Sequence, residues 1–380
     1  MLTYSKLSFW EKELFFNDLD ATLVGAGLVG YSTAISIKEK YPDKKVLILE
    51  RGYLPTGAST KNAGFTCFGS PTELLDDLKS ISEESIIGLV RKRYDGLNLL
   101  KERCEPDKID YIPCGSNELF TNSEKDLKNY DTCLSKLEYL NQIIENATQI
   151  KNNFSIANNT FGFNNINGLI FSKGEGQINT GRMMNQLHKK AVDLGVHILF
   201  STTVNSWEDQ GEDVSVETNY GCFRTKKLII ATNGLTKQIL PEINLSPARA
   251  QVIITKPLSD KPFEGTFHYD EGYFYFRNVG NRVLVGGGRN LDLEGEKTDE
   301  IENTDIIMNS LKHLLSDVIL PNQNVEIEQQ WAGIMGVGTT KEPIVQSIST
   351  NVHIGVRLGG MGVALGSLVG QELSELIPFE

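Results

Sequence analysis

The feature that most constrains this chain is a glycine-rich turn between a short apolar strand and a helix. Residues 25–30 read G-A-G-L-V-G. Gly25 allows a tight turn, Gly27 lets the backbone approach a pyrophosphate, and Gly30 permits close packing of the helix on the strand. Glu50 ends a second apolar strand, where a carboxylate can accept hydrogen bonds from ribose hydroxyls. The pattern predicts a dinucleotide-binding β-α-β unit, without separating NAD from FAD.

The rest of the chain combines helical segments, buried strands and one strongly alternating region. At 380 residues, the chain is longer than one ordinary domain. The apolar run at 226–234 is typical of a buried parallel strand, whereas residues 250–288 alternate as in an antiparallel meander. The sequence therefore predicts an α/β chain, α+β overall, in which two domains are woven together by several crossings.

Charge and composition argue against several classes of protein. The formal net charge of −12 argues against nucleic acid as a partner, because a phosphate backbone requires a basic surface. Charged residues interrupt the apolar N-terminal stretch, and no run approaches the roughly 20 apolar residues that span a bilayer. The cysteines form no C-x-x-C pair and the histidines show no metal-binding spacing, so no metal site is expected. We expect a cytoplasmic protein without a membrane span, and peripheral association with a membrane stays open.

The segment after Glu50 carries a resemblance to a known family. Residues 51–64 read R-G-Y-L-P-T-G-A-S-T-K-N-A-G. This segment resembles the G-x-S-x-R-N-x-G loop of the D-amino acid oxidase family, FAD-dependent oxidoreductases that include glycine oxidase and sarcosine oxidase. Other segments resemble further family motifs in the same order along the chain. They are residues 176–182 (G-Q-I-N-T-G-R), 228–234 (L-I-I-A-T-N-G), 247–251 (P-A-R-A-Q) and 357–363 (R-L-G-G-M-G-V).

The resemblance implies a glutathione-reductase-like, FAD-binding Rossmann domain with an interleaved antiparallel-sheet substrate domain. The implied FAD-binding domain comprises residues 1–100, 172–245 and 326–380, and the substrate domain comprises residues 101–171 and 246–325. The implied reaction is oxidation of a C–N bond of a small amine or amino acid by hydride transfer to the flavin, with oxygen or a quinone as electron acceptor. Two alternatives stay open: an FAD-dependent 2-hydroxy acid dehydrogenase on the same scaffold, and a catalytically degenerate flavin-binding protein.

The implied cofactor site combines the glycine-rich turn with later segments of the chain. The turn at Gly359–Gly362 would direct a helix N-terminus at the flavin, and this positive end would stabilise the anionic reduced form. The predicted cofactor-binding residues are Gly25, Gly27, Gly30, Glu50, Arg51, Ser59, Thr60, Lys61, Asn62, Gly64, Val204, Asn233, Gly234, Gly359, Gly360, Met361, Gly362 and Val363.

Two departures from the family pattern bear on cofactor attachment and on the substrate. Some members attach FAD covalently through a cysteine in the region of residues 331–343 or a histidine in the loop after Glu50, where this chain has I-M-G at 334–336 and T-K-N at 60–62. Neither segment offers a suitable nucleophile, so we predict non-covalent FAD. Amino-acid-oxidising relatives often place a carboxylate-binding arginine where this chain has Met335.

Candidates on the substrate side come mainly from an aromatic strand. Tyr273 and Tyr275 share one face at a period of two and are predicted to line the pocket. Lys61, Arg277 and Arg289 are candidates for binding a substrate anion, and Arg277 is preferred because a planar guanidinium can bind a carboxylate bidentately. Either Arg277 supplies this contact or the substrate is an amine without that carboxylate. The predicted catalytic residues are therefore Arg277, Tyr275 and Tyr273.

We expect acid precipitation of the purified protein to release yellow FAD into the supernatant, because no attachment residue is present. Flavin that stays with the pellet, or NAD released in its place, would contradict this expectation. The Gly27→Val variant is the companion test, since a side chain at the second glycine blocks the approach of a pyrophosphate. An unchanged FAD content in that variant would show that the glycine-rich turn does not bind the cofactor.

Overall fold

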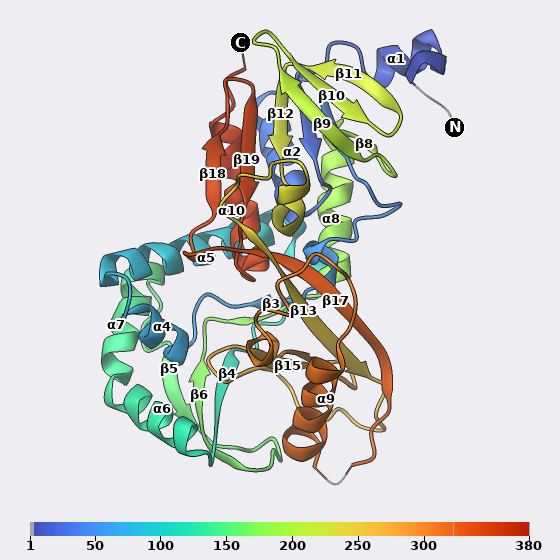
Figure 1. The fold of residues 1–380 in the computed structure, drawn as a ribbon. Helices are drawn as coiled ribbons and strands as arrows, with labels where there is room; N and C mark the ends of the chain where they lie inside the picture. Colours follow the sequence, from blue (N-terminus) through green and yellow to red (C-terminus); the bar gives the residue numbers. More distant parts are fainter. Residues whose placement is uncertain (1–3, 322, 380) are drawn as a thin grey trace.

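The computed structural model describes residues 4–321 and 323–379, which form two large sheets with helices around them (Figure 1). The six-stranded sheet lies in the upper half of that view and the eight-stranded sheet in the lower half. The strands of the six-stranded sheet, in order across it, are β18 (Ile344–Ser347), β19 (Val352–Val356), β12 (Lys227–Ile230), β1 (Ala21–Val24), β2 (Val46–Leu49) and β8 (His197–Leu199). β18 is antiparallel to β19, and the other neighbouring strands are parallel.

β1, helix α2 (Leu28–Lys40) and β2 form the predicted β-α-β unit. Every residue of β1 and β2 is buried, as parallel strands covered on both faces should be. Side chains of α2, α8 (Thr180–Asp193) and α10 (Gly362–Glu375) form the core on one face. The other face packs against a three-stranded sheet of β9 (Val204–Asp209), β10 (Val214–Thr218) and β11 (Gly221–Thr225). The predicted α/β class and Rossmann-type domain are confirmed.

The eight-stranded sheet is antiparallel except where β14 pairs with β4. Its strands, in order, are β17 (Ile327–Val337), β13 (Ser246–Thr255), β16 (Arg282–Gly287), β15 (Phe274–Val279), β14 (Thr266–Tyr269), β4 (Ser116–Thr121), β6 (Ile166–Ser172) and β5 (Phe154–Ala157). Phe267, Phe276 and Val285 pack on one face against helix α9 (Asp305–His313). Because strand residues alternate, the opposite face carries Tyr275 and His268. The predicted antiparallel region is confirmed.

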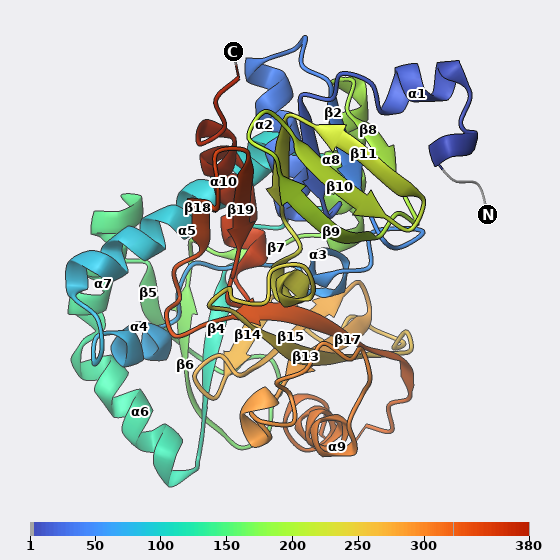
Figure 2. The ribbon, with the colours of Figure 1, turned by 45° about the horizontal axis from the view of Figure 1, so that its top comes forward.

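The membership of β17 in this sheet differs from the division into domains drawn from the sequence. The sequence division assigned residues 326–380 to the FAD-binding domain, but β17 pairs with β13 from Ser246↔Val337 to Thr255↔Ile327. The chain therefore crosses back to the six-stranded sheet only after Val337. In Figure 2, β13 and β17 are the strands of this sheet nearest the other half of the molecule.

The remaining elements surround the two large sheets, with α4 to α7 along one side (Figure 2). The helices are α1 (Phe9–Phe15), α3 (Ala58–Lys61), α4 (Pro71–Asp77), α5 (Glu83–Cys104), α6 (Glu124–Ser135) and α7 (Leu137–Thr148). The 3-10 helices are η1 (Tyr4–Lys6), η2 (Pro106–Ile109), η3 (Asn233–Gln238) and η4 (Arg289–Leu291), and η5 (Leu314–Ile319) is a π-helix. Strand β3 (Phe65–Thr66) pairs with β7 (Gly176–Gln177). Among the described residues, no helix combines the length and apolarity needed to cross a bilayer.

Glycines bring α2 and α10 into unusually close contact. A Cβ atom on Gly366 would lie 2.2 Å from a methyl carbon of Leu28, and one on Gly370 would lie 2.5 Å from the Cβ of Ser32. From the Leu28–Gly366 contact to the Ser32–Gly370 contact, the residue number rises by four on both helices. The two helices therefore run parallel. Their N-termini therefore lie at the same end of the molecule.

The Gly96→Ala variant should be destabilised, because its added Cβ would lie 2.0 Å from the carbonyl oxygen of Ala364 at the contact between α5 and α10. Overpacking of this kind costs about 1–3 kcal/mol. Gly88→Ala is the matched control on the same helix, where a Cβ meets nothing within 4 Å and should add about 0.5–1 kcal/mol of stability. Urea unfolding followed by circular dichroism measures both. Equal effects of the two variants would show that α5 does not approach α10 as described.

Candidate functional site

A cavity of about 550 Å³ lies between the two large sheets. On the six-stranded side it is lined by the turns after β1, β2 and β12, by α3 and by residues 358–364. On the other side it is lined by parts of β14, β15 and β17 and by the turn at 287–289. Sites for small ligands and cofactors occupy roughly 300–1,000 Å³. Such ligands bind at the carboxyl ends of the strands in α/β sheets, which is where this cavity lies.

One end of the cavity is built around the glycine-rich turn. Gly27 caps α2 without a side-chain hydrogen bond, and the amide of Leu28 donates to Ser59 Oγ at 2.9 Å. A Cβ on Gly27 would lie 3.2 Å from the same oxygen, and one on Gly30 would lie 2.0 Å from the carbonyl oxygen of Gly25. The turn thus excludes side chains while the N-terminus of α2 faces the cavity. This is the arrangement that binds a diphosphate.

Glu50 lines the same end of the cavity and supports the turn. Its Oε2 accepts a hydrogen bond from the amide of Ala26 at 3.0 Å, and its Oε1 accepts from the amide of Gly52 at 2.9 Å. Carboxylate oxygens retain further lone pairs, so this position can also accept from ribose hydroxyls. Val204, one of the predicted cofactor residues, lines the cavity. Thr202, which was not predicted, also lines the cavity, and its amide donates to the carbonyl oxygen of Glu50 at 2.9 Å.

The N-terminus of α10 faces the same cavity. Met361 caps this helix without a side-chain hydrogen bond, and Gly359 and Gly360 form the preceding turn with φ of +56° and +86°. Asn233 fixes the start of the turn, because its Oδ1 accepts from the amide of Arg357 at 3.0 Å. A parallel pair of helix N-termini therefore gives the cavity a positive potential at two places.

These features fit FAD. The N-terminus of α2 would hold the diphosphate, Glu50 the ribose, and the turn at 359–363 the flavin ring. The predicted cofactor residues that line the cavity are Gly25, Gly27, Glu50, Arg51, Ser59, Lys61, Asn62, Gly64, Val204, Asn233, Gly359, Gly360, Met361, Gly362 and Val363.

Three other predicted cofactor residues are not among the described residues that line the cavity. Gly30 allows α2 to pack on the turn, as described above. Thr60 Oγ1 donates to the carbonyl oxygen of Pro55 at 2.9 Å within its own loop. A Cβ on Gly234 would lie 2.5 Å from the carbonyl oxygen of Met335. These positions shape the walls of the site through packing and backbone geometry.

Arg277 is buried beside the cavity, outside its lining. Its Nη1 donates to the carbonyl oxygens of Ile178 at 2.9 Å and Gly64 at 3.3 Å. The guanidinium therefore ties β15 to the loop that carries the cofactor residues. This placement does not support the expectation that Arg277 contacts the substrate. Arg289 does line the cavity, and it takes the place of Arg277 as the candidate for binding an anion.

Tyr275 and His268 form an uncharged polar wall on the sheet side. The two residues oppose each other in the β14–β15 register, and Phe65 packs edge-on against both, with ring centroids 5.6 Å and 5.2 Å away. Burial raises the pKa of Tyr275 to about 12 and lowers the pKa of His268 to about 4. At neutral pH the phenol keeps its proton and the imidazole is uncharged. His268 was not among the residues predicted for the site, because a surface or packing role was favoured for it.

The far end of the cavity is highly charged but internally neutralised. Arg93 and Lys341 each lie 3.0 Å from an oxygen of Glu73, and Lys341 lies 2.7 Å from Asp77. Burial by itself would raise the pKa of the Glu73 carboxyl, but the two cations outweigh it and lower the pKa to about 2. The ion pairs join α4 and α5 to the loop after β17. No local sequence pattern indicates this cluster, because its members are far apart along the chain.

One cysteine, Cys67, lines the cavity. Burial raises the pKa of its thiol well above the ordinary value, and Glu175 and Glu73 add to the effect. A protonated thiol is a poor nucleophile. Its presence is therefore consistent with the prediction of non-covalent FAD.

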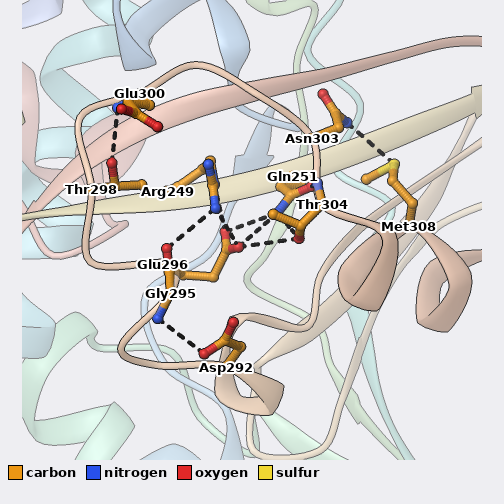
Figure 3. Close-up of polar contacts among 10 residues, drawn as sticks. All are labelled: Arg249, Gln251, Asp292, Gly295, Glu296, Thr298, Glu300, Asn303, Thr304 and Met308. Atoms are coloured by element: carbon orange, nitrogen blue, oxygen red, sulfur yellow. Dashed lines mark hydrogen bonds and ion pairs between the residues drawn. The ribbon is translucent and has the colours of Figure 1, made fainter.

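The loop from residue 288 to residue 304 covers part of the cavity and is fixed by a buried ion pair (Figure 3). Arg249 of β13 donates to both carboxylate oxygens of Glu296, at 3.0 and 2.9 Å. Gln251 donates to the same carboxylate and accepts a hydrogen bond from the amide of Thr304 at 2.8 Å. Removing one partner of a buried pair leaves an uncompensated charge, so this arrangement holds the loop firmly on the sheet.

Comparison with known proteins agrees with the geometry. Residues 20–376 match the family described as FAD dependent oxidoreductase. The "Probable oxidoreductase OrdL" of Haemophilus influenzae is 25% identical over 94% of this chain and 82% of that protein. The solved structure of L-proline dehydrogenase from P. horikoshii superposes with a TM-score of 0.74 at 16% identity, over 94% of this chain and 93% of that one. Iminodiacetate oxidase from Chelativorans sp. BNC1 also gives a TM-score of 0.74, at 17% identity over 95% and 96% of the two chains.

The Glu175→Gln variant should become more stable relative to the wild type as the pH rises from 5 to 8. Glu175 lies 4.0 Å from His268 and accepts hydrogen bonds from the amides of Phe68 and Gly69, and burial raises its pKa to about 7 from an ordinary 4.5. The folded state therefore holds a proton that the unfolded state releases, and the stability present below pH 4.5 is lost as the pH rises through 7.

Because glutamine is neutral throughout, the difference between the two unfolding free energies should change by about 2–3 kcal/mol over this range. Urea unfolding at pH 5 and pH 8 measures it. Glu84→Gln, an exposed position on α5, is the control. A difference that is the same at both pH values would mean that Glu175 is ionised in the folded protein.

Proposed function

Because this chain belongs to the FAD-dependent oxidoreductase family, we propose that it oxidises a C–N bond of a small amine or amino acid. FAD is its cofactor, as predicted, and the chain is an oxidoreductase. The proposal concerns the substrate class. It rests on the observation that the segments fitted to FAD and the neutral wall of Tyr275 and His268 line one cavity.

The neutral wall suits an amine because an amine must lose its positive charge before it can be oxidised. A buried, uncharged wall disfavours an ammonium group, since burial stabilises the neutral form of a base. Tyr275 keeps its proton at neutral pH and can donate a hydrogen bond to a nitrogen lone pair or a carboxylate oxygen. Phe65 packs edge-on against both Tyr275 and His268.

The atoms and electrons of the reaction balance as follows. The carbon next to nitrogen gives up a hydride, the nitrogen gives up a proton, and a C=N double bond forms. FAD supplies the acceptor for that hydride when it is bound. Water then hydrolyses the imine to a carbonyl compound and ammonia or an amine, and oxygen or a quinone takes the two electrons from the cofactor.

The names of the two structurally similar proteins support an amine substrate. One is a dehydrogenase of L-proline and the other an oxidase of iminodiacetate. In both compounds a carbon bonded to nitrogen carries a hydrogen that can leave as hydride. Neither name points to a 2-hydroxy acid. The fold is shared at 16–17% identity, so the names support a class of substrate and do not select one compound.

We expect amines or amino acids to bleach the flavin absorbance under anaerobic conditions, with ammonia or an amine released at one equivalent per flavin reduced. A panel of primary amines, secondary amines, amino acids and matched 2-hydroxy acids tests this. Bleaching by hydroxy acids alone would assign the chain to the dehydrogenase alternative. Absence of bleaching by every class, in protein that contains stoichiometric FAD, would assign it to the degenerate alternative.

A further inference from the structure

Arg289 is a cavity-lining cation without an acidic partner among the described residues. It lies in η4, immediately after the turn that ends β16, and its side chain is half-buried. Its guanidinium carbon lies 5.8 Å from the ring centre of Tyr273, which also lines the cavity. Within the described residues, no ion pair or hydrogen bond engages the guanidinium group. Its charge is therefore available to a ligand in the cavity.

The acidic residues of the cavity wall contrast with Arg289, because each has a partner within the protein. Glu50 accepts from backbone amides, and Glu73 pairs with Arg93 and Lys341. Asp76 pairs with Lys79 at 3.1 Å, and Glu271 pairs with Lys125 at 3.3 Å. Each of these acids thus has a partner within the protein, and Lys125 also pairs with Asp270 at 2.6 Å, whereas Arg289 has no acidic partner among the described residues. A ligand anion can therefore pair with this guanidinium without displacing a carboxylate of the protein.

The backbone turn at Gly287 and Gly288 determines the position of Arg289. Gly287 and Gly288 have φ of +108° and +78°, and the amide of Gly288 donates to the carbonyl oxygen of Tyr273 at 2.8 Å. A Cβ on Gly287 would lie 1.9 Å from that same oxygen. Only glycine allows so close a crossing, and the crossing brings Arg289 over the tyrosine ring.

The turn is also held from both sides. Asn290 donates to Asp270 at 2.8 Å, and the loop that follows is fixed through Glu296 to β13 (Figure 3). Arg289 is therefore carried by a pre-organised turn, and little ordering is needed when it binds a ligand. A planar guanidinium can form two parallel hydrogen bonds with a carboxylate.

The position of Arg289 along the wall bears on the substrate. Tyr273, in the turn just before β15, and Tyr275 of β15 both line the cavity. They are two residues apart in the chain, which spans at most about 7 Å. Tyr275 packs on Phe65 in the part of the wall that carries His268, whereas Tyr273 lies under Arg289. At Gly360, before the α10 N-terminus, the facing side chain is the uncharged Met335, whose sulfur would lie 3.4 Å from a Cβ on that glycine.

We propose that Arg289 binds the carboxylate of the substrate, and that several carbon atoms separate this carboxylate from the oxidised C–N bond. The substrate class is then an ω-amino carboxylate or a related amine with a distant acidic group. The inference rests on the proposed function for the amine, but the anion site itself is independent of it. Arg289 takes the part that the sequence analysis gave to Arg277.

The first experiment measures binding without any reaction. Pentanoate has the carboxylate and the carbon chain but no nitrogen to oxidise. Its dissociation constant for the FAD-loaded protein is obtained from the change in flavin absorbance and from calorimetry. We expect Arg289→Met to weaken pentanoate binding by about 10- to 100-fold, the range for losing a charge-assisted hydrogen-bonded pair, and Arg289→Lys to weaken it less. Arg224→Met, which removes a guanidinium from the exposed β11, is the control and should leave it unchanged.

The second experiment separates chain length from charge. Glycine, β-alanine, 4-aminobutyrate, 5-aminovalerate and butylamine are compared as anaerobic reductants of wild type and Arg289→Met. The variant should raise the half-saturating concentration of the longer amino acids and leave that of butylamine unchanged. Among the amino acids, glycine should show the smallest increase. An equal effect on glycine would overturn the separation between carboxylate and amine.

The outcomes distinguish this inference from the proposed function. Pentanoate binding that Arg289→Met does not weaken, or no binding by the wild type, would overturn the anion site even if amines reduce the flavin. Binding that depends on Arg289, with no amine reducing the flavin, would support the anion site and overturn the proposed function. FAD content is measured in each variant, and it should equal that of the wild type.

Discussion

The close parallel packing of α2 and α10 is the constraint on which the site depends. Gly366 and Gly370 let the two helices pack closely, because neither glycine has a side chain at the contact. The hydroxyl oxygens of Ser32 and Ser367 lie 3.4 Å apart between the helices. Because the helices are parallel, both N-termini open onto one cavity. An antiparallel pair would have placed one negative end there, which would repel both a diphosphate and an anionic flavin. The sheet, the glycine turns and the cofactor loop are arranged around this pair.

The second half of the site is a rigid wall attached to that cofactor-binding frame. β17 and β13 pair with each other and form the part of this wall nearest the six-stranded sheet (Figure 2). The ion pair of Arg249 with Glu296 fixes the loop at 288–304 to β13. A buried ion pair contributes little net stability compared with apolar packing, but breaking it by removing one partner costs about 3–5 kcal/mol. Its value here lies in fixing one loop conformation. That conformation carries Arg289 into the cavity, which links a structural ion pair to substrate selection.

The parts of the molecule that depend on local chemistry could be predicted from the sequence. The glycine-rich turn, the helix from residue 362 and the antiparallel region at 250–288 each follow from residues that are neighbours in the chain. The period of two also assigned Tyr273 and Tyr275 to one face of a strand that Arg277 ends. It could not show where along that face the cavity ends, because this depends on Gly64 and Ile178, whose carbonyl oxygens engage Arg277.

Other features depend on register between distant segments and left no local signal. His268 belongs to the wall because β14 pairs with β15 in one register, and a shift of one residue would have turned it to the opposite face. Glu73, Arg93 and Lys341 meet only after α4, α5 and the loop after β17 have packed together. The place of β17 in the eight-stranded sheet was likewise hidden, since its sequence is compatible with either domain.

The most direct test of this account is a crystal structure of the FAD-loaded protein with pentanoate bound. The account requires the diphosphate at the N-terminus of α2, the flavin ring between the turn at 359–363 and Tyr275, and the carboxylate paired with Arg289. A flavin ring that lies outside the space between α10 and β15 would contradict the central claim that the paired helix N-termini and the sheet wall form one active site.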